Sequence, residues 1–323
     1  MRAIRFHEHG DESVLQVDDI ERPEPAPDEI QVETRAIGIN HVDAIYREGI
    51  FTPPGMPAIP GSDFAGVVSA VGEQVDAYAV GDRVHGAGLG GDRPGSYAEY
   101  VTAPLSRVSH LPDAVGFEHG AAMGHVGVAA WQAVIHHGDP EPGDIVLIHG
   151  GGGGVGHIAV QLAANAGATV ITTEGEEATR EWLHELGAHH TFDFRREDLQ
   201  DVITTIGAPS VIVDYFFDQY LSFDVETIAH EGHISVLEFS TEEGGSATID
   251  QSTLRAGLLK DLTIQLVNIY NGDISNILGN LTELYVRGDF DIQIHERYDL
   301  TEAATAQHDI VEEVQRGKLI LTV

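Results

Sequence analysis

Glycines at positions 151, 153 and 156 fit the pattern G-x-G-x-x-G. In that pattern the first glycine permits a tight turn, the second lets backbone approach a pyrophosphate, and the third lets a helix pack close to a strand. A helix that begins near Gly156 also directs its free N–H groups and positive dipole end at the same anion. We therefore predict that the phosphates of a dinucleotide bind at Gly151, Gly152, Gly153, Gly154, Val155 and Gly156.

The residues around these glycines supply the elements that must position them. Ile145 to Ile148 is a short apolar run, typical of a strand covered on both faces. A helix is expected from Gly156 to Gly167, and a second strand follows it. Glu174 ends that strand 18 residues after Gly156 (174 − 156), near the spacing at which an acid meets an adenosine ribose hydroxyl. A glycine run can also be a plain turn and an acid plain surface, but this order of elements favours the dinucleotide site.

The charge of the chain is its most unusual bulk property. The 323 residues include 52 acids and 17 bases, which gives a net charge of −35. Only two of the bases, Lys260 and Lys318, are lysines. The acids are scattered and form no tail. Such a surface predicts a halophilic protein, because molar salt with a Debye length of about 3 Å screens the self-repulsion. The same charge argues against nucleic acid and anionic membranes as partners.

The absence of cysteine narrows the chemistry further. It excludes disulfides, thiolate zinc sites and a cysteine nucleophile. No apolar run reaches the roughly 18 residues of a membrane span, and no signal peptide opens the chain. We expect a cytoplasmic protein of two domains, since the length suffices for two.

Several further motifs follow one another in a recognisable order: Pro60 to Val68 (PGSDFAGVV), Gly81 to Val84 (GDRV), Gly95 to Tyr100 (GSYAEY) and Leu111-Pro112, followed by the glycine turn. With these motifs the chain resembles the medium-chain dehydrogenase/reductase superfamily. It is most similar to the zinc-free, zeta-crystallin-like quinone oxidoreductase branch. The resemblance extends over essentially the whole chain, from Met1 to Leu319.

The resemblance implies an α/β fold with two domains. A GroES-like, β-rich catalytic domain would comprise residues 1–121 and 268–323, and a Rossmann coenzyme domain with a doubly wound parallel sheet would comprise 122–267. The active site would lie in the cleft between them. A strand at Leu262 to Val267 falls where the family has an edge strand that pairs between subunits, which implies a homodimer. Core positions expected near the end of the chain are Leu278, Leu281, Leu284, Tyr285, Ala303, Ile310 and Val314.

The positions that bind zinc in other branches of the superfamily are changed here. Zinc alcohol dehydrogenases place a cysteine where this chain has Asn40 and a histidine where it has Ser62, and neither residue is a good zinc ligand. A short loop from Gly86 to Gly95 replaces the cysteine-rich lobe. A cluster of acids and histidines could hold a divalent ion, but we interpret these side chains as hydrogen-bonded acids and solvated histidines and predict no metal. The residues in question are His41, Asp43, Asp63 and His125.

Without a Lewis acid, carbonyl reduction lacks the ion that stabilises a developing alkoxide. Hydride transfer to a quinone or an α,β-unsaturated carbonyl spreads the charge by conjugation, so we predict an NAD(P)H-dependent quinone or enone oxidoreductase. The predicted catalytic residues are Asn40, Tyr46 and Asp63. Asn40 would hydrogen-bond the acceptor carbonyl or fix the nicotinamide. Tyr46 stands one step after a tyrosine of the family branch, and is either a proton donor or an ordinary packed tyrosine.

Two other functions stay open at this point: an alcohol or aldehyde dehydrogenase of the same superfamily, and a nucleotide-binding protein without turnover. The residues near the predicted ribose site also give conflicting indications of whether the cofactor is NAD(H) or NADP(H). Relatives usually take NADPH with a lysine and a tyrosine where this chain has Thr179 and Phe194. Arg180 could face a 2′-phosphate, whereas Glu174 would repel it and accept hydrogen bonds from free ribose hydroxyls. We therefore expect NAD(H), with NADP(H) left open.

Overall fold

The structure is a computed structural model that describes residues 1–238, 249–313 and 315–323. The chain divides into two compact units. Unit 1 comprises Met1–Val128 and Ile269–Val323, and unit 2 comprises Ala129–Asn268. The division predicted from the sequence places the boundaries after residues 121 and 267.

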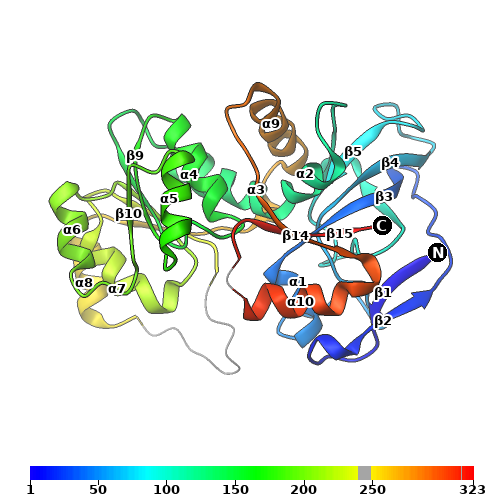
Figure 1. Ribbon diagram of the computed structural model, residues 1–323, viewed down its shortest axis with the longest axis horizontal. Helices are drawn as coiled ribbons and strands as arrows, with labels where there is room; N and C mark the ends of the chain where they lie inside the picture. Colours follow the sequence, from blue (N-terminus) through cyan, green and yellow to red (C-terminus); the bar gives the residue numbers. More distant parts are fainter. Residues whose placement is uncertain (239–248, 314) are drawn as a thin grey trace. The chain divides into compact units, whose positions relative to one another are not determined.

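Unit 1 is built on a seven-stranded sheet with the order β14-β15-β3-β4-β5-β7, in which β6 also pairs with β3 (Figure 1). Its neighbours are antiparallel except β14 and β15. A separate hairpin joins β1 (Arg2–Phe6) to β2 (Leu15–Asp19). The strands of the main sheet are β3 (Glu29–Ile39), β4 (Phe64–Val71), β5 (Arg83–Gly86), β6 (Tyr100–Pro104), β7 (Val108–His110), β14 (Ile294–Asp299) and β15 (Lys318–Thr322).

The long strand β3 contributes to two parts of the core of unit 1. Ile30 and Val32 pack with apolar residues of β4 to β7, while Ile37 and Ile39 pack with Leu319 and other residues of β15 and of α10. The helices of this unit are α1 (His41–Glu48), α2 (Phe117–Ala122), α9 (Ile274–Arg287) and α10 (Ala303–Glu312), with 3₁₀ turns at Glu12–Val14, Leu105–Arg107, Ile269–Asn271 and Leu300–Glu302. Of the predicted core positions, Leu278, Leu281 and Ala303 are buried, Leu284, Tyr285 and Ile310 are partly buried, and Val314 lies outside the described residues.

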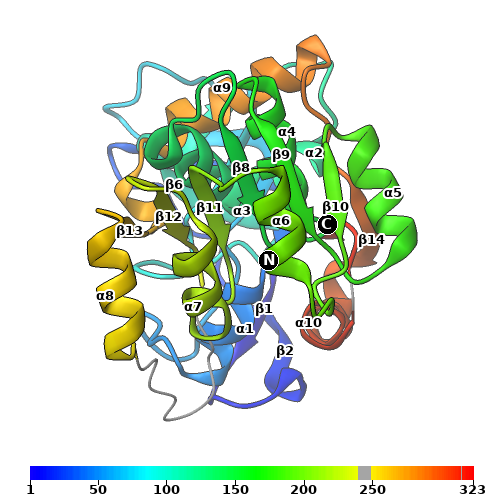
Figure 2. The ribbon, with the colours of Figure 1, turned by 90° about the vertical axis from the view of Figure 1, so that its left-hand side faces the viewer.

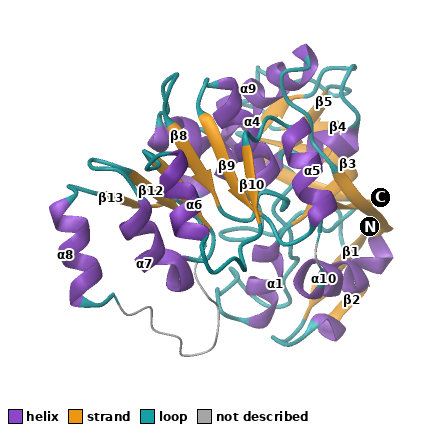
Figure 3. Cartoon of the chain, turned by 60° about the vertical axis from the view of Figure 1, so that its left-hand side comes forward, coloured by secondary structure: helices purple, strands orange, loops and turns teal. Residues whose placement is uncertain are grey.

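Unit 2 contains a six-stranded sheet with the order β10-β9-β8-β11-β12-β13, and every neighbouring pair is parallel. Figure 2 looks onto this sheet, and Figure 3 shows β8, β9 and β10 side by side. The predicted doubly wound parallel sheet is therefore confirmed. Its strands are β8 (Ile145–Ile148), β9 (Thr169–Thr173), β10 (His190–Phe192), β11 (Val211–Asp214), β12 (His233–Val236) and β13 (Thr263–Leu266).

The helices of unit 2 cover the sheet. Apolar residues of α6 (Leu199–Ile206) and α7 (Phe217–Thr227), among them Ile203 and Val225, pack on the buried strands of the sheet. The β-branched and aliphatic residues of these strands require such a cover. The helix α3 (Gly124–Trp131) begins in unit 1, enters unit 2 at Ala129 and continues directly into a π-helical segment, Gln132–Gly138. The other helices are α4 (Gly156–Asn165), α5 (Glu177–Glu185) and α8 (Gln251–Leu259). No helix in the described parts of the chain is long and apolar enough to cross a membrane.

Candidate functional site

The glycine turn joins β8 to α4, and its glycines meet different surroundings. A Cβ on Gly151 would lie 2.1 Å from the Thr172 hydroxyl oxygen, and one on Gly156 would lie 2.2 Å from the backbone oxygen of Gly150. Both positions therefore need glycine for packing. A Cβ on Gly153 would meet a single atom at an ordinary 3.5 Å, so this glycine leaves space that a phosphate can enter. The turn thus fits the phosphates of a dinucleotide.

The left-handed conformation of this turn falls on Gly150, whose φ is +64°. The sequence pattern assigned the tight turn to Gly151, one residue later, because the G-x-G-x-x-G spacing says nothing about a glycine that precedes it. An L side chain at Gly150 would be strained in this conformation. Phe216, which follows β11 and is 42% exposed, lies 3.6 Å from where a Cβ of Gly150 would be.

Glu174 follows β9 and lies against the glycine turn. Its Oε2 accepts a hydrogen bond from the backbone N–H of Gly152 at 3.1 Å, and its Oε1 accepts from the N–H of Gly175 at 2.7 Å. Arg180, on α5, donates from Nη1 to the backbone oxygens of Glu174 and Gly175 at 2.8 and 2.7 Å. The structure therefore brings both predicted cofactor-binding side chains to the loop after β9, beside Gly152.

A buried chain of hydrogen bonds, which sequence reasoning missed, also supports the glycine turn. The N–H of Gly150 donates to Thr173 Oγ1 at 3.3 Å, and this hydroxyl lies 3.2 Å from His149 Nδ1. His149 Nε2 lies 2.9 Å from Asp224 Oδ1. Burial opposes the charged form of His149, but the charge of Asp224 and its hydrogen bond raise the pKa of this imidazole overall. Asp224 lies on α7, 75 residues after His149, so no spacing pattern could have paired them.

In unit 1, the side-chain amide of Asn40 is held at both ends. Its Nδ2 donates to Asp63 Oδ2 at 2.8 Å, and its Oδ1 accepts from the ammonium of Lys318 at 2.6 Å. The backbone N–H of Asn40 donates to Asp43 Oδ2 at 2.9 Å, and the Tyr97 hydroxyl donates to the same oxygen at 3.0 Å. All five side chains are buried. The structure thus joins the predicted residues Asn40 and Asp63, and it adds Lys318, Asp43 and Tyr97 to them.

The charges of this cluster compensate each other only in part. Burial raises the pKa of Asp43 to about 7 and also raises the pKa of Asp63. Burial lowers the pKa of Lys318, although both carboxylates favour its charged form. Burial therefore favours the protonated form of both carboxyls, and the charge of Lys318 opposes this effect.

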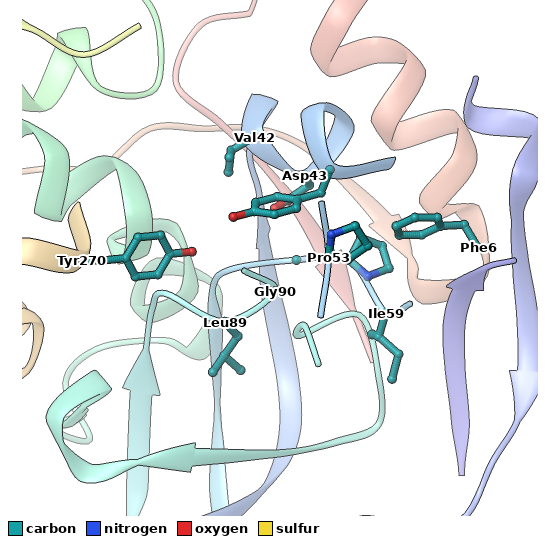
Figure 4. Close-up of a pocket in the computed structure, with 11 residues that line it drawn as sticks. Phe6, Val42, Asp43, Pro53, Ile59, Leu89, Gly90 and Tyr270 are labelled. Atoms are coloured by element: carbon teal, nitrogen blue, oxygen red, sulfur yellow. The ribbon is translucent and has the colours of Figure 1, made fainter. Parts of the chain in front are cut away.

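Tyr46 lines a pocket of unit 1 together with Val42 and Asp43, which lie in the first turn of α1. Figure 4 shows Val42, Asp43 and Tyr270 around this pocket, with the Tyr270 hydroxyl directed into it. The Tyr270 side chain hydrogen-bonds the Tyr46 hydroxyl, and burial raises the pKa of Tyr46 above its usual value. At neutral pH Tyr46 is therefore a protonated phenol and can donate. The preceding residue, Ile45, is buried in the protein.

The donors around Asn40 fit a zinc ion poorly. The Ser62 hydroxyl accepts a hydrogen bond from the N–H of Gly88 at 2.9 Å, and Asp63 Oδ1 accepts from the N–H of His125 at 2.8 Å. Asn40 is held between Lys318 and Asp63, as described above. Among the residues that the structure describes, no three histidine, aspartate or glutamate side chains are grouped as metal ligands.

Comparisons with known proteins place this geometry in context. Residues 26–113 match the alcohol dehydrogenase GroES-like domain, and residues 154–283 match the zinc-binding dehydrogenase domain. The quinone oxidoreductase of Mus musculus is 30% identical over 99% of this chain and 97% of its own length. The quinone oxidoreductase of Pseudomonas aeruginosa is 28% identical over 99% of both chains.

Two solved structures extend these similarities. The Escherichia coli quinone oxidoreductase complexed with NADPH covers 100% of both chains with a TM-score of 0.90 and 27% identity. An NAD-dependent alcohol dehydrogenase covers 100% of both chains with a TM-score of 0.90 and 28% identity. The predicted fold, a GroES-like domain with a Rossmann domain, is confirmed by these matches.

Proposed function

Because the chain belongs to the medium-chain dehydrogenase/reductase superfamily, in which it is an oxidoreductase with a nicotinamide cofactor, we propose that it reduces quinones or α,β-unsaturated carbonyls without a metal. Its branch would be the zeta-crystallin-like one. The observation that carries the proposal is the amide of Asn40, held between Lys318 Nζ and Asp63 Oδ2. This residue stands at the position where zinc alcohol dehydrogenases carry a cysteine. A buried ammonium at 2.6 Å from its oxygen disfavours a second cation there.

The bound nicotinamide would supply the hydride, and the chain's own groups would bind the acceptor and provide a proton. Asn40 is fixed in one orientation, with its Nδ2 directed at Asp63 Oδ2 and at the backbone oxygen of Gly38, so its proposed role is to fix the nicotinamide rather than to donate to the acceptor. Tyr46 presents a neutral phenol in its pocket. Asp63 orients the amide of Asn40 through its 2.8 Å hydrogen bond and acts as a positioning residue.

We propose NADH as the preferred cofactor. The carboxylate of Glu174 lies within hydrogen-bond distance of the glycine turn, where it would repel a 2′-phosphate and accept from ribose hydroxyls. Arg180 is bound to two backbone oxygens of the same loop, so it is partly committed to the protein. Concentrated salt weakens this repulsion, and the expected preference is a difference in affinity rather than an absolute choice.

A panel of acceptors tests the proposed function. Oxidation of NADH and NADPH is followed with quinones, enones, aldehydes and simple ketones in concentrated salt, and the metal content of the purified protein is measured. Turnover with quinones or enones and no stoichiometric metal is the expected result. Turnover confined to aldehydes and simple ketones would favour the dehydrogenase, and cofactor binding without turnover would favour a non-catalytic protein. Stoichiometric zinc, with activity lost on chelation, would overturn the metal-free proposal.

Tyr46→Phe is expected to lower kcat by about tenfold to a hundredfold for enones without raising the KM for the cofactor, because it removes a proton donor and leaves the dinucleotide site unchanged. Steady-state kinetics with an enone and a quinone measure the effect. Tyr78→Phe is the control, since its hydroxyl donates to a backbone oxygen, that of Val108, outside the pocket. Equal turnover in Tyr46→Phe and the wild type would remove Tyr46 from the mechanism.

We also propose a homodimer formed through the edge of the sheet in unit 2. Leu266 on the edge strand β13 is 62% exposed, and Leu258 and Leu259 at the end of α8 are 76% and 69% exposed. Leucines as exposed as these are unusual on a surface that carries so many acids. A second copy of the chain would cover them and would pair with β13, the edge strand of the sheet in the described residues.

Leu266→Asp is therefore expected to convert the dimer to a monomer in concentrated salt, as measured by analytical ultracentrifugation. Val80→Asp is the matched control, because Val80 is 65% exposed in unit 1 and the change adds the same charge. A wild-type protein that sediments as a monomer, or a Leu266→Asp variant that remains a dimer, would contradict the proposed interface.

We propose, finally, that the protein works in molar salt. The ammonium groups of both lysines are hydrogen-bonded within the protein. Lys318 is buried and donates to Asn40. Lys260 donates to the backbone oxygens of Val225, Glu226 and Ile228 near the end of α7. The ammonium groups that usually hydrate and balance a protein surface are thus replaced by carboxylates, and the net charge reaches −35.

A further inference from the structure

Asp193, which follows β10, binds two arginines beside the predicted ribose site. Its Oδ1 and Oδ2 accept from Arg195 Nε and Nη2 at 2.8 and 2.7 Å, which is the two-pronged geometry of a strong ion pair. Its Oδ2 also lies 3.8 Å from Arg180 Nη1. The hydrogen bonds from Arg195 hold the pKa of Asp193 well below its usual value. Asp193 therefore stays ionised and pairs with both guanidinium groups.

The two arginines meet at the loop that contains Gly175. Arg180 Nη1 and Arg195 Nη2 both donate to the backbone oxygen of Gly175, at 2.7 and 2.8 Å. Gly175 follows Glu174, whose carboxylate accepts from the N–H of Gly152 in the glycine turn. The guanidinium groups therefore lie at the end of β9, where the proposed function places the adenosine ribose.

The carboxylates around this loop oppose the binding of a phosphate, although two arginines lie there. The hydrogen bond and the charge of Asp193 raise the pKa of Arg195 most, and the charges of Glu176 and Glu174 add to this effect. These three carboxylates outnumber the two guanidinium groups. Among these acids only Asp193 is a direct ion-pair partner of both arginines. The Arg195 side chain is 62% exposed, so its guanidinium group can turn to a ligand once it is released.

We propose that Asp193 is a specificity-determining residue for the dinucleotide: it occupies the guanidinium group of Arg195 and so withholds it from a 2′-phosphate, while Arg180 stays bound to the backbone oxygens of Glu174 and Gly175. The inference rests on the proposed nicotinamide-dependent function and adds a second acid to Glu174. Arginine binds phosphate and carboxylate with the same fork of N–H groups, so Asp193 and a 2′-phosphate compete for the same donors. Removal of the Asp193 charge frees these donors for the phosphate.

Asp193→Asn tests the proposal. The substitution keeps an oxygen that can accept from the N–H of Arg195, as Asp193 Oδ1 does at 2.9 Å, so the turn is preserved while the charge is lost. Dissociation constants for NADH, NADPH, 5′-AMP and 2′,5′-ADP are measured by calorimetry in concentrated salt. The ratio of NADPH to NADH affinity is expected to rise about tenfold, with the same change between the two adenosine phosphates, because charged hydrogen bonds to phosphate are gained.

Asp198→Asn is the matched control. Arg196 and Asp198 form a similar exposed pair two residues apart, at 2.9 and 2.8 Å, so this variant removes the same charge from the same kind of pair. Its affinity ratio is expected to equal that of the wild type. In Asp193→Asn/Arg195→Ala the gain should disappear, because the donor is missing.

Four results would overturn the inference: an unchanged ratio in Asp193→Asn, an equal gain in Asp198→Asn, a gain that survives the loss of Arg195, or a wild type that already prefers NADPH strongly. The failure of the proposed function looks different. A wild-type protein that binds neither NADH nor NADPH removes both proposals, whereas NADH binding with an unchanged ratio removes only the role of Asp193.

Discussion

Gly156→Ala is expected to destabilise unit 2 by about 3 kcal/mol and to abolish dinucleotide binding, because overpacking against backbone typically costs this much. The new Cβ would lie 2.2 Å from the backbone oxygen of Gly150 and 2.8 Å from the Cα of Gly151. Alanine gains about 1 kcal/mol over glycine in a helix, but that gain is smaller than the cost of moving the turn. Thermal unfolding and calorimetric titration with NADH, both in concentrated salt, measure the two effects.

Gly153→Ala is the matched variant and separates folding from binding. Its Cβ would meet only the backbone oxygen of Gly150, at 3.5 Å, so the unfolding midpoint should match that of the wild type. The methyl group would nevertheless occupy the space proposed for a phosphate, and NADH affinity should fall at least tenfold. Wild-type affinity in Gly153→Ala would mean that the cofactor does not approach this glycine, and wild-type stability in Gly156→Ala would refute the packing argument.

Transfer from molar salt to dilute buffer is expected to unfold the protein at room temperature. With a net charge of −35, the folded chain holds many carboxylates close together, and the Debye length increases from about 3 Å at 1 M to about 10 Å at 0.1 M. Repulsion that salt had screened then acts across the surface and favours the expanded chain. Circular dichroism against NaCl concentration measures the transition.

Sucrose provides the control for this experiment. It is excluded from protein surfaces and favours compact states without screening charge. If screening is the cause, sucrose in dilute buffer should restore much less structure than NaCl does. Full stability and full activity in dilute buffer would contradict the proposed adaptation to salt, and restoration by sucrose alone would assign the effect to surface hydration.

Local patterns were enough to predict the coenzyme half of the fold. The apolar run at Ile145 to Ile148, the glycines and the helix after Gly156 lie next to each other in the sequence, and the structure keeps them in that order as β8, the turn and α4. Glu174 could be placed because a fixed number of residues separates it from Gly156. Gly150 could not be assigned the turn, since its φ depends on backbone geometry that no residue type encodes uniquely.

Local sequence patterns could not predict the hydrogen-bond and ion-pair partners of the site residues. Lys318 reaches Asn40 across 278 positions, because β15 pairs with β3, and the order of strands in a sheet is not written in any local pattern. Tyr270 reaches Tyr46 for a similar reason, since unit 1 is built from both ends of the chain. Asp193 lies near Arg195 in sequence, but its proximity to Arg180 follows from the pairing of β10 with β9.

The insertion of β15 between β3 and β14 has a consequence for biosynthesis. Unit 2 is a continuous stretch and can fold as soon as it leaves the ribosome, since domains generally fold as units. In the sheet of unit 1, the end of β3 from Ala36 to Ile39 must wait for its partner β15, a strand translated after all of unit 2. That same strand carries Lys318, which orients Asn40. A nascent chain interrupted before residue 318 would therefore lack both an interior strand and the ammonium group that orients the amide of Asn40.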